Sequence, residues 1–460
     1  MAQLVAHLHG MQGVRGSNPL RSTLIEIIRV PDPSTRNNPL DCFAHSGPPS
    51  TKSFASPTIS IGVLEHRKGV FVSSFSTAET VMGFDALFNA EELGWRDKAR
   101  KFSLERIQPQ IDEDFEIQRL RTELIGEMGE LGMLGMHIEG YGCAGASAVS
   151  YGLVCYELEA VDTSWRTHIS VLGSLAMAAI AKFGSEEQKQ EYLPASARGE
   201  LAGCFGLSEP QGGSDPSNML TKAVKDGDHW VINGAKRWIG IANIADYAII
   251  WADTEDGVRG FIVPTNTPGF TATPISNKLS MRASIQCDID LENVRVPESL
   301  RLPLAKGLGA PFSCLNEARY GIVWGVMGAA RAAIDVAVTF SKERILFGKP
   351  LAATQITQTK LADCFLEFEK GVLLSHHIGK LKDAGTLTHD QISVGKLNNV
   401  REAVGIVSTV RSILGGNGVT ADYPIMRHMM NLESVRTYEG TDEVHALVVG
   451  RALTGEEAFR

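Results

Sequence analysis

The sequence lacks a run of apolar residues long enough to cross a membrane. A spanning helix needs roughly 18 consecutive apolar residues, and the most apolar window, residues 171–181, is closed by Lys182. A basic excess is also absent, because 53 Asp and Glu outnumber 44 Lys and Arg and give a formal net charge of -9. Nucleic-acid binders need clustered basic side chains to displace counterions from phosphate. We therefore expect no membrane span and no nucleic-acid partner.

Cysteine pairs at metal-ligand spacing are missing as well. The seven cysteines are scattered, and no two of them form a CxxC pair. An odd, dispersed set fits neither a disulfide framework nor a zinc site. We expect reduced and mostly buried thiols, no bound metal, and a reducing compartment. This is the cytoplasm if the protein is bacterial, or the mitochondrial matrix if it is eukaryotic.

What is present is ordinary for a soluble globular protein, with 43% apolar and 21% charged residues in a chain of 460. That length allows two or three domains. Residues 1–81 differ from the rest, because they are rich in turn-forming Pro and Gly and show no helical period. Their arginines are also a feature of mitochondrial transit peptides. We favour a disordered or artefactual extension for this segment.

The remaining sequence predicts an α+β multidomain fold in three parts. Residues 82–202 are expected to form an N-terminal helical domain, residues 203–312 a middle β domain, and residues 313–460 a C-terminal four-helix bundle. Apolar residues recur at roughly helical spacing over 90–107, over 115–131 and from 146 to about 192. The bundle helices are predicted at 315–346, 354–384, 388–414 and 430–452.

The β domain is indicated by short apolar runs between turn residues. Asn233-Gly234 follows the apolar Trp230–Ile232 and is the strongest short hairpin signal. Further strands are predicted at 247–251, 261–263 and 289–296, with a turn at 254–257.

A glycine-rich segment, Gly206–Asp215, opens this domain. On its own it is either a loop that needs positive φ or a loop whose amides and hydroxyls approach a flavin ring or a phosphate. It resembles the first signature of the acyl-CoA dehydrogenase family, and four further motifs follow in the family's order. They are Lys236–Ile239, Arg344–Gln355, Leu414–Gly418 and Tyr438–Thr441.

The resemblance implies an FAD enzyme whose cofactor is shared between subunits of a homotetramer, with an electron-transfer flavoprotein as acceptor. The stretch from Arg344 to Gln355 reaches the FAD of a neighbouring subunit in the family. The cofactor contacts that the resemblance implies are Phe205, Leu207, Ser208, Gly213, Ser214, Trp238, Arg344, Phe347, Gln355, Gly415, Gly416 and Thr441.

The same resemblance makes Glu439 the catalytic base. The α-proton of a thioester is a weak acid, and a carboxylate in a water-poor pocket has a raised pKa that makes it a better base. A lone Glu near a helix start is otherwise a dipole-stabilising acid. In the family, the backbone N–H of this Glu helps to hold the thioester oxygen. Asn316, Arg319 and Tyr438 are expected beside the substrate, although an Arg at a helix start is usually a surface charge.

Within the family, the closest resemblance is to the glutaryl-CoA dehydrogenases. There, residues at the positions of Arg166 and Ser170 bind the distal carboxylate, and an acid at the position of Glu159 supports the arginine. Four residues apart on a helix, Arg166 and Ser170 face the same way, and a guanidinium with a hydroxyl is a good carboxylate receptor. The alternative is a purely structural pair of Arg166 and Glu159.

One departure from the family pattern concerns the flavin. After Trp238-Ile239 the family has Thr-Asn, whereas this chain has Gly240-Ile241. The change favours altered redox tuning or oxygen access, and it resembles plant short-chain acyl-CoA oxidases. Our hypothesis is oxidation of glutaryl-CoA with decarboxylation to crotonyl-CoA. A short-chain dehydrogenase or oxidase without decarboxylation is the first alternative, and a non-catalytic CoA-ester-binding protein is the second.

Overall fold

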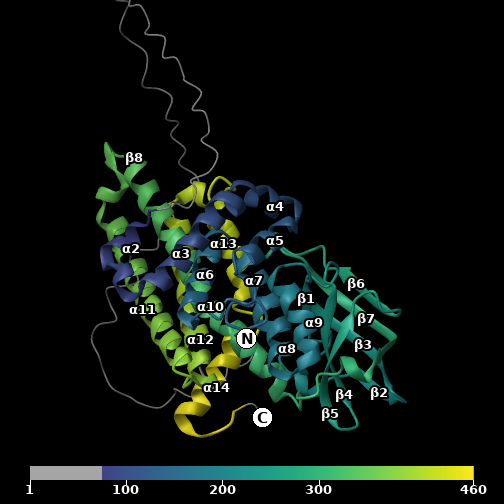
Figure 1. Ribbon diagram of the computed structural model, residues 1–460. Helices are drawn as coiled ribbons and strands as arrows, with labels where there is room; N and C mark the ends of the chain where they lie inside the picture. Colours follow the sequence, from purple (N-terminus) through teal and green to yellow (C-terminus); the bar gives the residue numbers. More distant parts are fainter. Residues whose placement is uncertain (1–74, 459–460) are drawn as a thin grey trace, which may run out of the picture. The chain divides into compact units, whose positions relative to one another are not determined.

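The computed structural model describes residues 75–458, and it contains a helical region, a sheet and a second set of long helices (Figure 1). This order confirms the predicted α+β architecture. The first helical region contains α2 (Thr77–Met82), α3 (Ala90–Phe102), α4 (Ile111–Ile117), α5 (Glu123–Glu130), α6 (Ala148–Val161), α7 (Thr163–Ile169), α8 (Ala178–Phe183) and α9 (Glu186–Ala197). Short 3-10 turns lie at Phe84–Leu87 and Gln108–Gln110, and π-helical turns at Ser103–Ile107 and Ser170–Met177.

Ordered structure begins earlier than the sequence predicted. All of helix α2 except Met82 lies within the segment expected to be an extension, and the Ser76 side chain caps the helix. The backbone N–H of Thr77 donates to Asp335 Oδ1 at 2.9 Å, so this helix is tied to the C-terminal helices. The prediction of a disordered or artefactual extension was therefore wrong for 77–81, and its remaining part at 1–74 lies outside the described residues.

The helix predicted at 115–131 is two helices. Helix α4 ends at Ile117, and Gln118 adopts a left-handed conformation with φ +58°. Helix α5 begins only at Glu123. A residue with a side chain in this conformation ends the helical hydrogen-bond pattern, which apolar spacing alone does not reveal.

The sheet has seven strands: β1 (Gly203–Gly206), β2 (Lys222–Asp226), β3 (His229–Gly240), β4 (Tyr247–Thr254), β5 (Gly257–Pro264), β6 (Phe270–Pro274) and β7 (Gln286–Pro297). Their order is β1-β4-β2-β3-β7-β6, with β5 paired to β4. The strands predicted at 247–251, 261–263 and 289–296 lie in β4, β5 and β7.

The hairpin predicted at Asn233-Gly234 was wrong. Both residues lie inside β3, where the pairing with β7 shifts register between Ile232 and Gly234. The turn from β2 to β3 falls instead after Asp226. A Cβ on Gly234 would lie 2.5 Å from Thr221 Oγ1, so the glycine serves a bulge with a close strand contact.

The C-terminal region contains α10 (Gly309–Glu343), α11 (Gln355–Asp383), α12 (His389–Ile413), α13 (Ile425–Val435) and α14 (Asp442–Thr454). A small hairpin of β8 (Ile345–Leu346) and β9 (Lys349–Pro350) follows α10, then a 3-10 turn at Leu351–Ala353, and another, η8, spans Gly415–Val419. The fourth helix predicted at 430–452 is broken into α13 and α14. The break carries Glu439 and Gly440, whose φ angles are +55° and +96°.

Helix α10 is the central element of the helical core and packs against α6, α11 and α12. Within residues 75–458 it is the one helix long and apolar enough to cross a membrane by length and composition, yet 89% of its most apolar window is buried inside the protein. Glycines allow its close contact with α6, because a Cβ on Gly328 would lie 1.8 Å from the carbonyl oxygen of Tyr156. Core helices of soluble proteins share this composition.

Candidate active site

Glu439 lies in the break between α13 and α14. Its left-handed backbone conformation is uncommon for a residue with a side chain and is typical of functional sites. The Oε2 atom of its carboxylate is buried and has no hydrogen-bond partner among residues 75–458. Buried polar atoms are nearly always hydrogen-bonded, so this carboxylate is available to a ligand.

The backbone around Glu439 is held by three basic side chains. Arg319 Nε, from α10, donates to the carbonyl oxygen of Glu439 at 2.7 Å, and His445 Nε2 lies 3.2 Å from the same oxygen. Lys396 Nζ, from α12, donates to the carbonyl oxygens of Tyr438 and Gly440 at 2.6 and 2.5 Å. The sequence did not reveal Lys396 or His445, because neither belongs to a recognised motif.

The electrostatic environment adjusts the basicity of Glu439. Burial raises the pKa of its carboxyl group above the usual value, and the charges of Arg166, Lys396 and Arg319 oppose that shift. The net direction is upward, which is the direction expected of a carboxylate that accepts a proton from carbon.

Arg166 is buried beside this loop and makes two side-chain interactions. Its Nε donates to Glu159 Oε2 at 2.6 Å, and its Nη2 donates to the hydroxyl of Tyr438 at 2.5 Å. Thr163 also donates to Glu159, at 3.0 Å. The ion pair of Arg166 and Glu159, which the sequence also allowed as a purely structural contact, is therefore present. It does not use the whole guanidinium, because Nη1 is buried without a partner among the described residues.

Ser170 follows Arg166 by one helical turn, and its backbone N–H donates to the carbonyl oxygen of Arg166. The Ser170 hydroxyl is buried and has no partner within residues 75–458. Arg166 Nη1, Ser170 Oγ and Glu439 Oε2 thus form a set of unpaired buried polar atoms. One cation and one hydroxyl suit an anionic group, and a carboxylate of raised pKa suits an acidic C–H.

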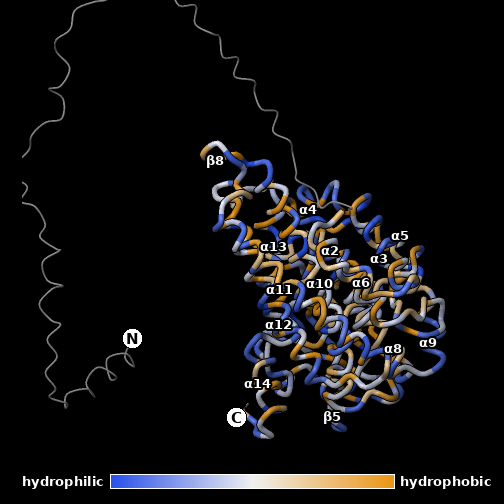
Figure 2. Tube along the Cα trace, turned by 90° about the vertical axis from the view of Figure 1, so that its left-hand side faces the viewer, coloured by the Kyte–Doolittle hydropathy of each residue, from blue (hydrophilic) through white to orange (hydrophobic). Residues whose placement is uncertain are grey.

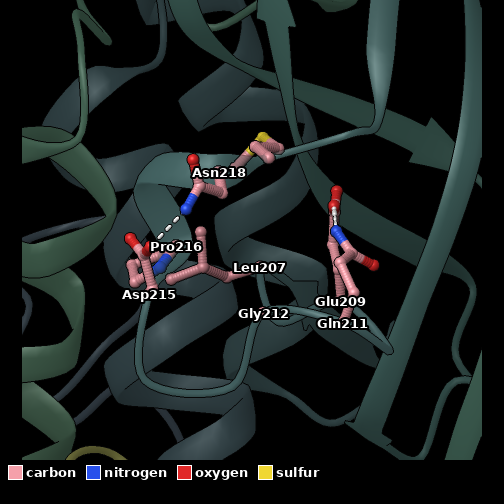
Figure 3. Close-up of a pocket in the computed structure, with 8 residues that line it drawn as sticks. Leu207, Glu209, Gln211, Gly212, Asp215, Pro216 and Asn218 are labelled. Carbon is pink, nitrogen blue, oxygen red and sulfur yellow. Dashed lines mark hydrogen bonds between the residues drawn. The ribbon is translucent and has the colours of Figure 1, made fainter.

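The loop after β1 is anchored by Glu209. Its carboxylate accepts from the backbone N–H groups of Leu220 and Thr221 at 2.6 and 2.9 Å, and from Lys236 Nζ at 2.8 Å. Lys236 is fully buried, and its burial lowers its pKa to about 8. Figure 3 shows Gln211 beside Glu209 and a hydrogen bond from Asn218 to Asp215 across the same loop.

Most of the sequence-predicted cofactor residues of the β domain lie in β1 or in this loop, and Trp238 lies in β3. Phe205 and Leu207 are buried, whereas Gly213 and Ser214 are exposed and Ser208 is partly exposed. The indole of Trp238 is 57% exposed, with φ +66°. Aromatic side chains of this size normally bury much of their surface. Its strand adjoins the loop, because the backbone N–H of Arg237 donates to the carbonyl oxygen of Ser208 at 2.9 Å. An exposed indole on a strand beside such a loop suits a flat aromatic ring such as a flavin.

The remaining cofactor predictions lie elsewhere in the fold. Arg344 and Phe347 belong to the β8–β9 hairpin, Gln355 begins α11, and Gly415 and Gly416 begin η8. The hairpin projects from the helices away from the strands in both views (Figures 1 and 2). Phe347 is 99% exposed. One chain therefore does not bring the hairpin residues to its own Trp238.

Two predicted residues have local structural contacts. Thr441 caps α14, because its hydroxyl accepts from the N–H of Val444 at 3.3 Å. Asn316 Oδ1 accepts from Arg319 Nη1 at 3.1 Å, on the turn of α10 that faces Glu439.

Comparison with known proteins gives a consistent result. The models of the N-terminal, middle and C-terminal domains of acyl-CoA dehydrogenases match residues 89–200, 204–294 and 305–454. A glutaryl-CoA dehydrogenase structure from Mycobacterium smegmatis is 53% identical and covers 84% of this chain and 100% of that chain, with a TM-score of 0.83. A structure of such an enzyme from the same organism in complex with FADH2 is 52% identical, with the same coverage and TM-score. The mitochondrial short-chain specific acyl-CoA dehydrogenase of Bos taurus is 36% identical over 365 residues, 78% of this chain and 88% of that protein.

Proposed function

Since this chain belongs to the acyl-CoA dehydrogenase family, we propose that it oxidises glutaryl-CoA and releases CO₂ to give crotonyl-CoA. The observation that carries the proposal is the buried, unpaired Nη1 of Arg166, followed one helical turn later by the buried, unpaired hydroxyl of Ser170. A buried guanidinium is costly without an anionic partner. Glu159 balances its charge, and a substrate carboxylate would occupy its remaining donors.

Glu439 is the proposed base for the α-proton. Its carboxylate is unpaired at Oε2, and its backbone N–H has no acceptor among the described residues. A free amide next to the base can donate to the thioester oxygen as negative charge develops there. The same residue would then supply both the proton acceptor and one donor of the oxyanion site.

The family's cofactor is FAD, which when bound accepts the hydride from the β-carbon. In this chain Trp238 and the loop residues Ser208 and Ser214 would contact the flavin ring of that cofactor. Gly415 and Gly416 would approach the diphosphate of a neighbouring subunit's cofactor, because space beside both is open enough for close backbone contact.

Decarboxylation follows from the position proposed for the distal carboxylate. After the double bond forms, the C–C bond to the carboxylate breaks, CO₂ leaves, and the electron pair is delocalised onto the thioester. The proton that Glu439 took from the α-carbon then returns to the γ-carbon of the dienolate, which gives crotonyl-CoA. Arg166 keeps the carboxylate in place until this step.

We also propose a homotetramer that passes its electrons to an electron-transfer flavoprotein. The exposed aromatic ring of Phe347 supports the assembly. The β8–β9 hairpin that carries it projects away from the strands (Figure 1), so a neighbouring subunit would supply its cofactor contact. Size-exclusion chromatography with light scattering tests it, and a monomer that retains FAD would contradict it.

Short-chain acyl-CoA oxidation without decarboxylation is the second candidate. Gly240 stands where the family has a hydroxyl donor, and a Cβ there would lie 3.2 Å from Val171 Cγ2. The site therefore lacks the hydroxyl and has little room for it. An oxidase would produce hydrogen peroxide in amounts equal to the substrate consumed.

The test is an anaerobic reaction of the purified yellow protein with glutaryl-CoA and with butyryl-CoA, followed by product analysis with an artificial electron acceptor. We expect flavin bleaching with glutaryl-CoA and the release of crotonyl-CoA and CO₂. An Arg166→Gln variant should lose glutaryl-CoA turnover and keep butyryl-CoA turnover. Bleaching with butyryl-CoA alone would exclude the dicarboxylate, and a colourless protein would favour a non-catalytic CoA-ester-binding function.

A further inference from the structure

Lys396 is a buried lysine whose hydrogen bonds go to carbonyl oxygens rather than to a carboxylate. It lies in the middle of α12 and is 1% exposed. Burial lowers the pKa of its ammonium to about 7, while the negative charge of Glu439 opposes that shift. Burying a lysine is costly, so this position requires an explanation beyond packing.

The two acceptors of Lys396 lie on either side of Glu439. They are the carbonyl oxygens of Tyr438 and Gly440, at 2.6 and 2.5 Å. The carbonyl oxygen between them is held by Arg319. The side chains of Lys396 and Arg319 therefore hold three consecutive carbonyl groups. They keep the backbone at Glu439 in a left-handed conformation that a residue with a Cβ otherwise disfavours.

Helix α12 contributes to this loop a second time through His445. Ser393, one turn before Lys396, lies with its hydroxyl 3.1 Å from His445 Nδ1, and His445 Nε2 lies against the carbonyl oxygen of Glu439. A Cβ on Gly440 would lie 2.7 Å from the same nitrogen. The nearby acid Asp442 is already paired with Arg436 at 3.0 Å.

We propose that Lys396 is a positioning residue for the proton transfer. Its ammonium holds the carbonyl groups on both sides of Glu439, so that the carboxylate and the backbone N–H of that residue face one ligand together. The inference rests on the proposed function, in which Glu439 is the base. Lys396 contacts the loop, whereas Glu439 contacts the substrate.

The test compares Lys396→Met and Lys396→Arg with the wild-type enzyme, and Lys380→Met is the matched control. Lys380 is a lysine of α11 that is paired with Glu92 at 2.8 Å. For each protein we would measure kcat, KM, the FAD content, the melting temperature and the isotope effect with α-deuterated butyryl-CoA and glutaryl-CoA.

We expect Lys396→Met to lower kcat about 100-fold, because small misplacements of a reacting group have effects of this size. KM should stay within about threefold and the isotope effect should rise, since proton removal becomes slower while binding is kept. Lys396→Arg keeps the charge and the donors but moves them, so its kcat should be intermediate and its isotope effect also raised. The control should match wild type in kcat, KM and isotope effect.

The inference is overturned if the Lys396 variants keep wild-type kcat and isotope effects. It is also overturned if their activity falls only in proportion to lost FAD or lost folded protein. Should Lys396→Met fail to fold, Lys396→Arg alone decides between these results. Wild-type enzyme that acts on neither thioester would instead overturn the proposed function.

Discussion

Arg166 and Tyr438 are 272 residues apart in the chain, and the guanidinium of the first donates to the hydroxyl of the second. Tyr438 directly precedes Glu439, and its hydroxyl also lies 3.2 Å from Thr167 Oγ1. The residue proposed to bind the distal end of the substrate is thus connected to the loop of the proposed base. A change at one of them should be measurable at the other.

The first prediction concerns the pH dependence of an Arg166→Gln variant. Among the charges that lower the pKa of Glu439, that of Arg166 has the largest effect. Removing it should raise that pKa further. The base must be deprotonated to act, so the acidic limb of kcat/KM for butyryl-CoA should move to higher pH. A pH profile identical to wild type would show that Arg166 and Glu439 do not interact.

The second prediction is that Gly325→Ala selectively impairs glutaryl-CoA turnover. A Cβ at this position of α10 would lie 2.1 Å from Glu159 Oε2 and 3.1 Å from Arg166 Cγ. The ion pair must therefore move, and overpacking of this kind costs roughly 1–3 kcal/mol of stability. Turnover of glutaryl-CoA should fall more than that of butyryl-CoA.

Gly405→Ala is the control for this substitution. Gly405 lies inside α12, and a Cβ there meets nothing within 4 Å. It should be neutral or raise stability by about 1 kcal/mol, because Ala is the better helix former. If Gly325→Ala reduced the turnover of glutaryl-CoA and butyryl-CoA equally, this would contradict a role of the Arg166–Glu159 pair in carboxylate binding.

How much the sequence could predict depends on how local each signal is. The helical and β regions follow from apolar spacing, and Glu439 and Arg166 were proposed as site residues through short motifs. Lys396 was missed because its role depends on α12 meeting a loop some forty residues later, which no local pattern records. Asn233-Gly234 misled because Asn-Gly also suits a bulge, and the choice depends on Thr221 in a neighbouring segment.

The third prediction concerns a buried ion cluster between α2, α6 and α10. Arg331 is paired with Glu79 at 2.7 Å and with Glu157 at 2.9 Å. Arg331→Leu leaves these carboxylates with too little positive charge, and breaking a buried pair costs roughly 3–5 kcal/mol. Chemical denaturation should show this loss. A change below about 1 kcal/mol would contradict the importance of the cluster.

The same cluster gives a pH dependence. The neighbouring arginines offset the effect of burial and lower the pKa of Glu79 from 4.5 to about 2. A lowered folded-state pKa stabilises the protein above the unfolded value, and this stabilisation is lost as the pH falls from about 4.5 towards 2. A Glu79→Gln variant should therefore lose less stability than wild type over that range.

The fourth prediction is that Glu209→Ala weakens FAD retention. The substitution removes the acceptor for two backbone amides of the loop and leaves Lys236 buried without its carboxylate. The ratio of flavin absorbance to protein absorbance should fall after gel filtration. Asp253→Asn is the control, because it breaks a surface pair with Lys222. Full FAD content in Glu209→Ala would show that the loop does not depend on this anchor.

Helix α10 has a consequence for protein engineering. Along its length Arg319 supports the backbone of Glu439, Gly325 makes room for the ion pair of Arg166 and Glu159, and Arg331 joins the ion cluster. These three positions are six residues apart on one helix. A redesign that repacks this helix would therefore change turnover, selectivity and folding together. Directed evolution towards new acyl groups should therefore leave α10 intact and vary the π-helical turn that begins at Ser170.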